Sequence, residues 1–455
     1  MSKDWDKLAG EEGERVTSSR FGRMWKLGKM GAKVTASMLA NRASNLLSSE
    51  EDQAERNDET RKRNAKHVAE VLGQLKGASM KVGQLMSADP ELSPEGFGEI
   101  LSTLQSEAPP MTYRTVKEQI ERNLDRPIEV VFRDFDPEPI GAASIGQVHR
   151  ATLDTGETVA VKVQYPGVMD ALDSDIRTIT NLLGYGRAMV DKKRLDEYAA
   201  EIRDLLLTEA DYIREAEAIA SFGPVLASRE GIRAPRAFPE WTSKEVLTME
   251  YIEGTKLDVA LEHMDEERRT RILERWVSLY AWMVHERFDL HADPHPGNFL
   301  LDAHDDIIVL DFGSVRTFDA GFGDDLLDLL DTCWQRQPER AIPIYESMGF
   351  GDDDFDPRDL NPNDLYEYHE IILAPFLTDS AFDFGSWTPG AEGREFMMSH
   401  PTMLKLVPPA SALPYFRTLS GIKGLLARFD AKINVFQLTY ETAKRRGRLT
   451  GEPLV

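Results

Sequence analysis

Residues 291–298 read HADPHPGN, and residues 310–313 read LDFG. Asn298 follows Asp293 by five positions, and Asp311 follows after an apolar run. One carboxylate in such a loop can orient or deprotonate an acceptor, whereas an amide oxygen and a second carboxylate can hold Mg²⁺ against nucleotide phosphates. The two motifs together predict Mg²⁺–ATP chemistry, with Asp293 as the catalytic residue and with Asn298 and Asp311 as metal ligands.

The composition of the 455-residue chain limits the classes of protein to consider. Its net charge of −24 argues against a protein that binds nucleic acid, and its 41% of hydrophobic residues suffices for a sizeable core. Cys333 is the single cysteine, so a disulfide within the chain is excluded and a reducing, cytoplasmic compartment is expected. No stretch of about 18 apolar residues occurs, and no transmembrane helix is therefore predicted.

A basic amphipathic segment lies within the polar N-terminal extension, residues 1–65. Its basic residues recur at spacings of three and four, from Arg20 to Lys33, and aromatic and aliphatic residues lie between them. A helix with this pattern can lie on an anionic membrane, or it can pack against the protein with its charges in water. The sequence leaves both alternatives open, and the segment Arg20 to Lys33 is the candidate for a peripheral membrane contact.

Hydrophobic periodicity divides the rest of the chain into three regions. Residues 66–112 have a helical period, residues 113–253 mix short strands with helices, and residues 254–455 are mainly helical in pattern. Strands are expected at residues 130–132, 147–151, 158–164 and 246–251. A small mixed lobe followed by a large helical lobe predicts a two-lobed α+β fold of the protein-kinase type, with an added helical region before it.

A strand lysine and a small-residue loop supply candidate phosphate contacts. Residues 159–163 read VAVKV, where apolar flanks bury the strand and leave Lys162 to reach the α- and β-phosphates. The loop before this strand occupies the position of a kinase phosphate loop. Its candidate nucleotide-binding residues are Gly141, Ala142, Ala143, Ser144, Ile145 and Gly146. The Cβ atoms of Ala142 and Ala143 restrict the backbone, so we expect a tighter loop than G-x-G-x-x-G.

An acidic helix and a hinge complete the set. One acid of the helix should pair with Lys162, and the sequence alone leaves Glu209 and Glu215 as alternatives. An apolar strand ends at Glu250 and Ile252, which fit a hinge whose backbone groups bind adenine. Loop, lysine, helix acid, hinge, catalytic loop and Asp-Phe-Gly all occur in the order typical of kinases. This order predicts a kinase-like nucleotide site.

Two departures argue against a protein kinase. Ala292 occupies the arginine position of the H-R-D motif, and no A-P-E follows Asp-Phe-Gly. A helix-like acidic run begins soon afterwards, at Asp324, so the platform that binds peptide substrates is expected to be absent. The His295-Pro296-Gly297 segment within the catalytic loop is more typical of small-molecule kinases.

These motifs resemble those of the ABC1/UbiB/ADCK atypical kinases, from about residue 66 to residue 330 and more weakly toward both ends. The specific marks are K-x-G-Q at 81–84, the alanine-rich loop at 142–144, E-x-D at 209–211 and the sequence HADPHPGN at 291–298. Gly141 departs from the family, which usually begins this loop with alanine.

The resemblance implies a two-lobed protein-kinase-like fold with a helical K-x-G-Q region over the active site. Lys81 and Gln84 would point into the cleft, where the E-x-D motif would help to hold them. Glu215 would be the acid that pairs with Lys162. A lysine in this position would exclude large substrates and add positive charge near the phosphates.

The resemblance also implies a role in ubiquinone or related isoprenoid-lipid metabolism. ATP and Mg²⁺ would be the cofactors, and a prenylated lipid or a quinone-pathway enzyme would be the partner. Without a terminal hydrophobic hairpin, the chain is closest to the soluble branch of the family, a cytoplasmic enzyme working peripherally at the membrane. Two alternatives remain: a nucleotide-gated, non-catalytic scaffold for lipid-biosynthetic enzymes, and a small-molecule kinase, which the K-x-G-Q segment disfavours.

Overall fold

A computed structural model describes residues 111–143, 145–168, 192–351 and 357–454. The chain forms two compact units, of which the first takes the described residues up to 168 together with 203–223 and 235–252. The second takes 192–202, 224–234 and the described residues from 253 onward. Helices α8 (Lys192–Glu209) and α9 (Tyr212–Leu226) each contribute residues to both units. The expected N-terminal extension, the segment Arg20 to Lys33 and most of the region 66–112 lie outside the described residues.

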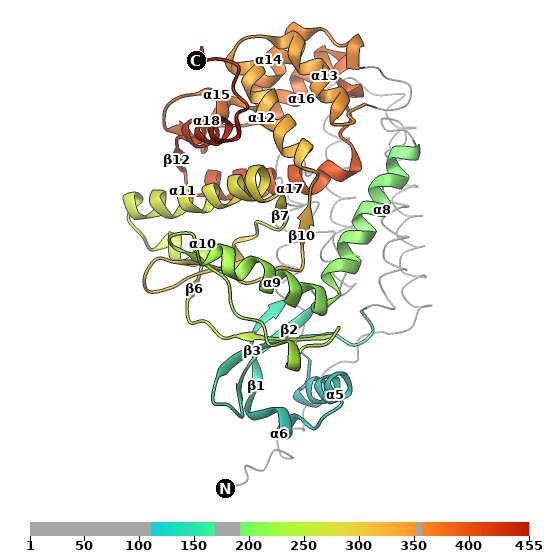
Figure 1. The fold of residues 1–455 in the computed structure, drawn as a ribbon, viewed down its shortest axis with the longest axis vertical. Helices are drawn as coiled ribbons and strands as arrows, with labels where there is room; N and C mark the ends of the chain where they lie inside the picture. Colours follow the sequence, from blue (N-terminus) through green and yellow to red (C-terminus); the bar gives the residue numbers. More distant parts are fainter. Residues whose placement is uncertain (1–110, 144, 169–191, 352–356, 455) are drawn as a thin grey trace, which may run out of the picture. The chain divides into compact units, whose positions relative to one another are not determined.

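A four-stranded antiparallel sheet forms the centre of the first unit (Figure 1). In sheet order its strands are β1 (Phe132–Ala143), β2 (Gly146–Leu153), β3 (Thr158–Gln164) and β5 (Val246–Glu250). Gly156 makes the turn between β2 and β3 with φ of +93°, a conformation that glycine adopts without steric cost. β3 is buried along almost its whole length because strands flank it on both sides and α5 packs against it.

Within the described residues, two helices precede the sheet and pack on it. α5 (Tyr113–Leu124) begins after Thr112, whose hydroxyl accepts a hydrogen bond from the Thr115 amide, a typical N-cap. α6 (Ile128–Val131) follows Pro127 and turns into β1 at Phe132. The expected strand at 130–132 is therefore wrong for its first two residues. Pro127 fixes φ at −58°, which favours a helical turn, and this turn buries Val131 while Val130 faces solvent.

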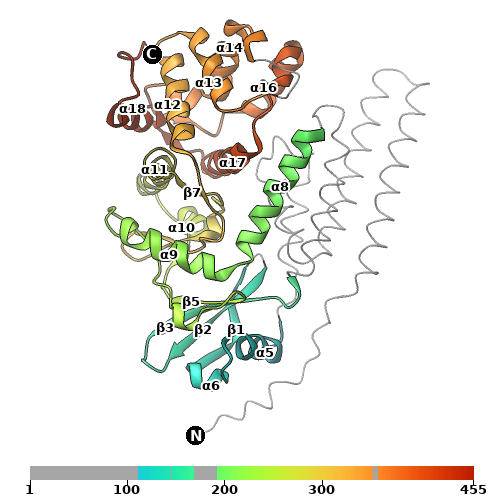
Figure 2. The same cartoon turned by 45° about the vertical axis from the view of Figure 1, so that its right-hand side comes forward.

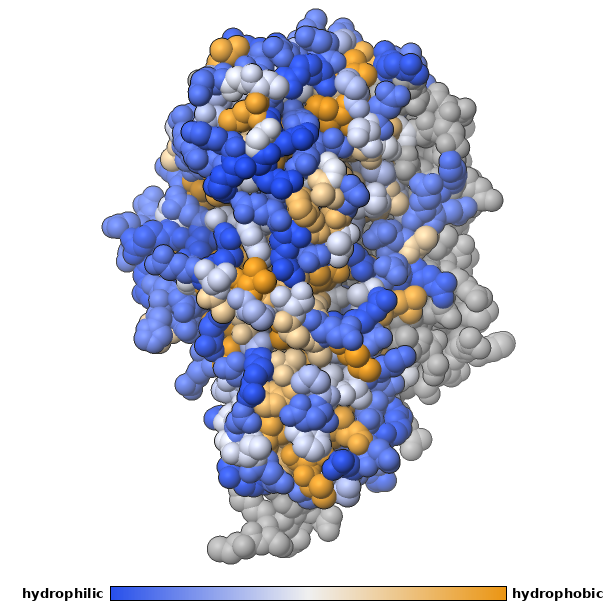
Figure 3. Space-filling model, viewed as in Figure 1, coloured by the Kyte–Doolittle hydropathy of each residue, from blue (hydrophilic) through white to orange (hydrophobic). Residues whose placement is uncertain are grey.

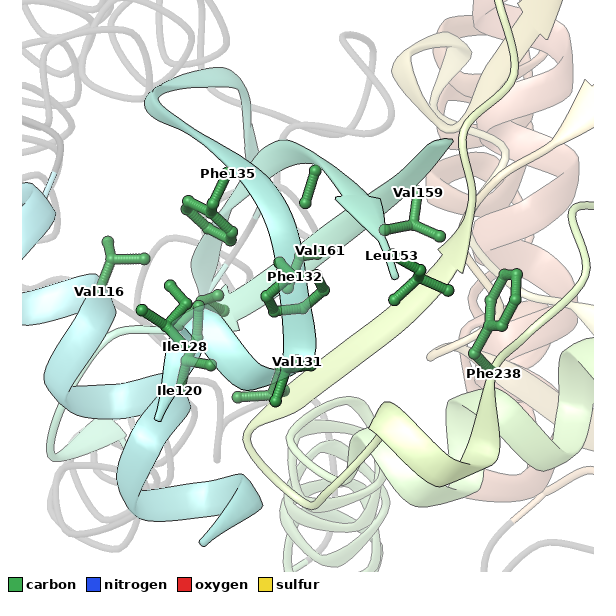
Figure 4. Close-up of a cluster of buried hydrophobic side chains, with 13 residues drawn as sticks. Val116, Ile120, Ile128, Val131, Phe132, Phe135, Leu153, Val159, Val161 and Phe238 are labelled. Atoms are coloured by element: carbon green, nitrogen blue, oxygen red, sulfur yellow. The ribbon is translucent and has the colours of Figure 1, made fainter. Parts of the chain in front are cut away.

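Side chains from both helices and the sheet form one hydrophobic cluster (Figure 4). Val116 and Ile120 lie four residues apart on α5 and are fully buried on one face of that helix. The cluster comprises Val116, Ile120, Ile128, Val131, Phe132, Phe135, Ala151, Leu153, Val159, Val161, Val163, Phe238 and Val246. It fixes the position of β3 and hence of the lysine that this strand carries.

Two helices follow the first three strands. They are α8 (Lys192–Glu209) and α9 (Tyr212–Leu226), which carry the two acids, Glu209 and Glu215, that the sequence offers as partners of Lys162. They are separated at Asp211, whose side chain accepts a hydrogen bond from the amide of Ile213 at 3.1 Å. The break starts α9 in a new direction and places Glu215 in its first turn.

The second unit is mainly helical (Figure 2). Its larger helices are α10 (Leu257–Glu262), α11 (Glu266–Trp282), α12 (Ala320–Trp334), α13 (Ala341–Ser347), α14 (Pro362–Ile372), α16 (Pro389–Ser399), α17 (Leu413–Arg428) and α18 (Val435–Arg446). A four-stranded sheet has the order β4 (Ile232–Arg233), β9 (Ile307–Val309), β8 (Phe299–Leu301) and β6 (Thr255–Lys256). Two-stranded sheets pair β7 (Asp289–His291) with β10 (Val315–Thr317), and β11 (Phe382–Asp383) with β12 (Lys432–Ile433). Strands of two or three residues are too short for a periodic pattern, so the sequence did not predict them after residue 313.

The acidic run of α12 binds the C-terminal segment. Arg446 contacts Asp324 at 2.8 Å, and Arg448 forms a two-pronged pair with Asp328. Fully buried Asp331 accepts hydrogen bonds from Arg340 and from the Thr450 hydroxyl. These contacts give the acidic run a structural role.

Hydrophilic side chains cover most of the visible face of the helical unit, with isolated apolar groups between them (Figure 3). This surface agrees with the net charge of −24. Among the helices that the structure describes, none is both long and apolar enough to span a membrane.

The α5–sheet cluster predicts unequal effects for two isoleucines of the first unit. Ile120 is completely buried, so Ile120→Ala should lower the free energy of unfolding by about 2–5 kcal/mol. Ile140 is 49% exposed, so the matched change Ile140→Ala should cost less than about 0.5 kcal/mol. Chemical denaturation of both variants measures the difference. Equal losses would contradict the assignment of Ile120 to the core.

Candidate active site

A buried ion pair links β3 to α9 in the first unit. The Lys162 ammonium group donates hydrogen bonds to both carboxylate oxygens of Glu215, at 3.0 and 2.9 Å. The exposed fractions of the two side chains are 5% and 0%. The ammonium also lies 4.9 Å from the centre of the Tyr212 ring, a favourable cation–π distance. The sequence left two acids as alternatives, and the structure pairs Lys162 with Glu215. Glu209 is also buried, but it is the last residue of α8.

The small-residue loop joins β1 to β2 directly before the lysine strand. Gly141, Ala142 and Ala143 end β1, and Gly146 starts β2, whereas Ser144 lies outside the described residues. A Cβ at Gly146 would overlap the carbonyl oxygen of Val163 on β3, so only glycine fits there. Nothing lies within 4 Å of a Cβ built at Gly141, so alanine, the usual residue of the family, would fit at this position.

The same loop is tied to the end of β3. The carbonyl oxygen of buried Ile145 accepts a hydrogen bond from the Tyr165 amide at 2.9 Å. The tip of the hairpin is thus anchored on the strand that carries Lys162. This arrangement suits a short, restricted phosphate loop better than a mobile glycine-rich one.

The hinge strand β5 ends at Glu250, and Ile252 is the last residue of the first unit. The Glu250 amide donates to the Arg236 carbonyl at 2.7 Å, and the Glu250 carboxylate accepts from the Arg236 amide at 3.1 Å. The Tyr251 amide donates to Thr158 on β3. Because the Glu250 amide is already engaged, recognition of adenine at this residue would use its carbonyl oxygen.

In the second unit, His291 connects the catalytic loop to the Asp-Phe-Gly segment. His291 is completely buried at the end of β7, and its Nε2–H group donates to the carbonyl oxygen of Asp311. Burial lowers the pKa of His291 below its ordinary value and so favours the neutral ring, whose proton then lies on Nε2 to make this contact. The Ala292 amide donates to Ser314 at 3.1 Å, so β7 and β10 continue to pair beyond His291.

The β8–β9 hairpin brings the two predicted metal ligands together. Phe299 pairs with Val309, and the Leu310 amide donates to the Asn298 carbonyl at 2.9 Å at the mouth of this hairpin. The Asn298 side-chain amino group donates to the Asp293 carbonyl at 3.2 Å, which orients the amide so that its oxygen is the remaining ligand atom. One Asp311 carboxylate oxygen accepts from the Gly313 amide at 2.9 Å.

These donors fit Mg²⁺. Mg²⁺ prefers oxygen ligands and is usually bound by one or two carboxylates, with nucleotide phosphates and water completing its octahedron. Asn298 and Asp311 offer an amide oxygen and a carboxylate. Over the described part of the chain, no group of three or more His, Cys, Asp or Glu residues could form an all-protein cage. Two protein ligands are the set expected when nucleotide phosphates and water complete the coordination of the metal.

Asp293 forms an ion pair that its sequence motif does not predict. Its Oδ1 lies 3.3 Å from Nη2 of Arg417 on α17, and the two side chains are about nine-tenths buried. Ala292, at the usual position of a loop arginine, is fully buried and carries no charge. The sequence held no signal for Arg417, because it lies more than a hundred residues from the loop, outside any motif.

Comparison with known proteins assigns this arrangement to a class. The model of the ABC1 atypical kinase-like domain matches residues 103–344, more than half of the chain. The chain belongs to this family of atypical kinases, and the kinase-like α+β fold expected from its motifs is confirmed.

Individual relatives extend the match beyond the family domain. "Atypical kinase COQ8, mitochondrial" of Saccharomyces cerevisiae is 30% identical over 94% of this chain and 85% of its own length. "Probable serine/threonine-protein kinase abkA" of Dictyostelium discoideum is 28% identical over 93% of this chain and 79% of its own length. The solved structure of the Rv3197–erythromycin complex from Mycobacterium tuberculosis is similar in fold, with a TM-score of 0.58, 24% identity and coverage of 90% of this chain and 98% of that one.

The buried pair predicts that stability and nucleotide binding can be separated. Glu215→Gln leaves the Lys162 ammonium buried without a counter-charge and should lower the free energy of unfolding by about 3–5 kcal/mol. The double change Lys162→Met/Glu215→Leu replaces both charges by apolar groups and should recover most of this loss, but not ATP binding.

Chemical denaturation and ATP-induced shifts in melting temperature measure the two effects. Glu157→Gln, which removes an acid from the exposed pair with Arg236, is the matched control and should change neither quantity appreciably. A double variant that still binds ATP like the wild type would contradict the phosphate-binding role of Lys162.

Proposed function

We propose that this chain is a Mg²⁺–ATP-dependent ATPase or phosphotransferase that supports ubiquinone or related isoprenoid-lipid metabolism at a membrane surface. The arrangement of the catalytic loop carries the proposal. Asn298 is bonded to Asp293 and to Leu310, and His291 holds the backbone of Asp311. An acceptor-positioning carboxylate and two oxygen ligands are thereby fixed in one hydrogen-bonded assembly.

In this proposal each predicted residue has one task. Lys162, oriented by Glu215, neutralises the α- and β-phosphates, and the loop from Gly141 to Gly146 covers them. The backbone groups of Glu250 and Ile252 recognise adenine. When bound by Asn298 and Asp311, Mg²⁺ supplies positive charge to the phosphate oxygens.

Asp293 acts on the acceptor. A new bond forms between the acceptor oxygen and the γ-phosphorus, and the bond from this phosphorus to the β–γ bridging oxygen breaks. ADP leaves with that oxygen and its electron pair, and the acceptor proton passes to the Asp293 carboxylate. The product is inorganic phosphate when the acceptor is water and a phosphate ester when it is a hydroxyl group.

Three features favour a small acceptor over a peptide. Ala292 occupies the position of the loop arginine that in protein kinases commonly pairs with a phosphorylated activation loop. Helix α12 begins at Ala320, shortly after Asp-Phe-Gly. Its acidic residues are occupied by arginines of the C-terminal segment. In the proposal, Lys81 and Gln84 of the K-x-G-Q motif restrict the site further; both lie outside the described residues.

The proposed pathway and location rest on the family. One relative is named "Atypical kinase COQ8, mitochondrial". Another is "Protein ACTIVITY OF BC1 COMPLEX KINASE 7, chloroplastic" of Arabidopsis thaliana, which is 33% identical over 64% of this chain and 42% of its own length. We extend to this chain a prenylated lipid or a quinone-pathway enzyme as its partner. Work in the cytoplasm, with the basic segment Arg20 to Lys33 as the membrane contact, completes the proposal.

Replacement of the catalytic carboxylate should abolish turnover without abolishing binding. Asp293→Asn should lower the rate of ADP release from Mg²⁺–ATP by about 10²–10⁴-fold, because the amide cannot accept the acceptor proton. The assay compares both proteins with and without anionic liposomes, and Asp154→Asn, at an exposed turn of the first unit, is the matched control. Equal rates for wild type and Asp293→Asn would refute the catalytic role.

Replacement of the metal ligand should instead affect binding. ATP should raise the melting temperature of the wild type more with Mg²⁺ than with EDTA, because a ligand that binds the folded state stabilises it. Asp311→Ala should lose this Mg²⁺-dependent increment, whereas Asp293→Asn should keep it. An undiminished increment in Asp311→Ala would show that this residue does not bind the metal. Stabilisation of the wild type by ATP without any ADP release would favour a non-catalytic scaffold.

A further inference from the structure

Helix α17 lies outside the part of the chain that matches the family domain, which ends at residue 344. It nevertheless contacts the catalytic loop at two neighbouring points. We propose that Arg417 of α17 is a positioning residue that holds the Asp293 carboxylate, so that the C-terminal segment completes the catalytic centre. The functional part of this inference rests on the proposed phosphotransfer activity.

The first contact is the ion pair itself. Arg417 and Asp293 approach to 3.3 Å, and their side chains are 10% and 12% exposed. A charge removed from water to this degree is costly unless it is paired, so the two groups depend on each other far more than an exposed pair would. The guanidinium group also restrains rotation of the carboxylate about its Cβ–Cγ bond, and thus the direction of both oxygens.

The second contact is a close approach of the backbone of α17 to the loop. Gly421 lies four residues after Arg417, on the same face of the helix. A Cβ on Gly421 would overlap the ring of Pro294, the residue directly after Asp293. The glycine therefore lets α17 lie against the catalytic loop, and the arginine one turn earlier reaches the carboxylate. Two independent contacts thus join one face of α17 to two adjacent residues of the loop, Asp293 and Pro294.

A second residue near Asp293 is uncharged. Burial, and next the negative charge of Asp293, raise the pKa of Tyr280 on α11 well above its ordinary value, so this phenol stays neutral. Its hydroxyl group is buried and has no hydrogen-bond partner among the described residues. Tyr280 cannot balance the charge of Asp293, and Ala292 carries no side chain that could. Arg417 supplies a buried cation to this carboxylate.

Fixing one carboxylate in this way has a mechanistic consequence. A general base must lie within hydrogen-bond reach of the acceptor, and misplacement by about 1 Å can cost about 10²-fold in rate. The ion pair holds Asp293 before the acceptor arrives. Loss of Arg417 should therefore lower kcat for ADP release and leave ATP binding, which uses other side chains, nearly unchanged.

Arg417→Ala, Arg417→Lys and the control Arg428→Ala test the proposal in the full chain. Arg428 lies on the same helix but forms exposed pairs with Asp258 and Glu262. With Mg²⁺–ATP, Arg417→Ala should lower kcat about 10–100-fold with a KM for ATP within about twofold of wild type. Arg417→Lys should regain at least about a tenth of the wild-type kcat because it keeps the charge. Arg428→Ala should match the wild type.

A second readout does not require turnover. Hydrogen–deuterium exchange of peptides covering residues 289–299 should be faster in Arg417→Ala than in the wild type and unchanged in Arg428→Ala. Equal exchange in all three proteins would overturn the inference. An active wild type whose kcat is matched by Arg417→Ala would also overturn it. If Arg417→Ala does not fold, the comparison of Arg417→Lys with Arg417→Gln decides, because only the former keeps a cation; equal kcat and exchange in these two would also overturn the inference.

Failure of the two proposals can be distinguished. A wild type that releases no ADP under any membrane condition, with loop exchange that still depends on Arg417, would refute the proposed activity and support the positional role of Arg417. An active wild type that loses activity in Asp293→Asn but not in Arg417→Ala would refute the role of Arg417 alone.

Discussion

A charge buried away from water must have a partner, and the first unit is organised around one such pair. Lys162 and Glu215 come from a central strand and from the first turn of α9, and both are almost completely removed from solvent. The hydrophobic cluster beneath β3 fixes the lysine, and the break at Asp211 fixes the start of the helix that carries the acid. The sheet is stabilised by apolar packing. That packing must also place the ammonium group and the carboxylate within contact distance, because neither charge is stable when buried alone.

The same constraint acts in the second unit with a different source of charge. Asp293 is about nine-tenths buried, and Ala292, the residue before it, is also buried and carries no charge. The cation comes from α17, so a helix near the C-terminus becomes necessary for a loop in the middle of the chain. In both units a residue with a predicted chemical role is held by a buried opposite charge on another element.

Local patterns predicted much of this protein. β3 was predicted at residues 158–164 from the apolar residues on both sides of one lysine, and the structure has the strand over the same residues. The kinase-like fold followed from the order of motifs, each of which can be read within about ten residues. The α6 turn at 128–131 was missed because a short run of β-branched residues has the same composition in a strand and in a buried helical turn. The strands β10 and β12 were missed because two or three residues carry no period.

Contacts between distant segments explain what the sequence could not predict. Arg417 is one of several arginines on charged helices, and nothing in its neighbourhood distinguishes it from Arg428, which remains at the surface. From sequence alone, Gly421 only lowers the helix propensity of α17. The structure shows that a larger residue there would overlap Pro294. Motifs identify the groups that can do phosphotransfer chemistry, because that chemistry needs particular atoms at particular spacings. Their orientation depends on packing, which can recruit any helix that reaches the loop. In this chain the recruited helix lies beyond the matched family domain, so an inventory of family motifs is incomplete as a description of the catalytic centre.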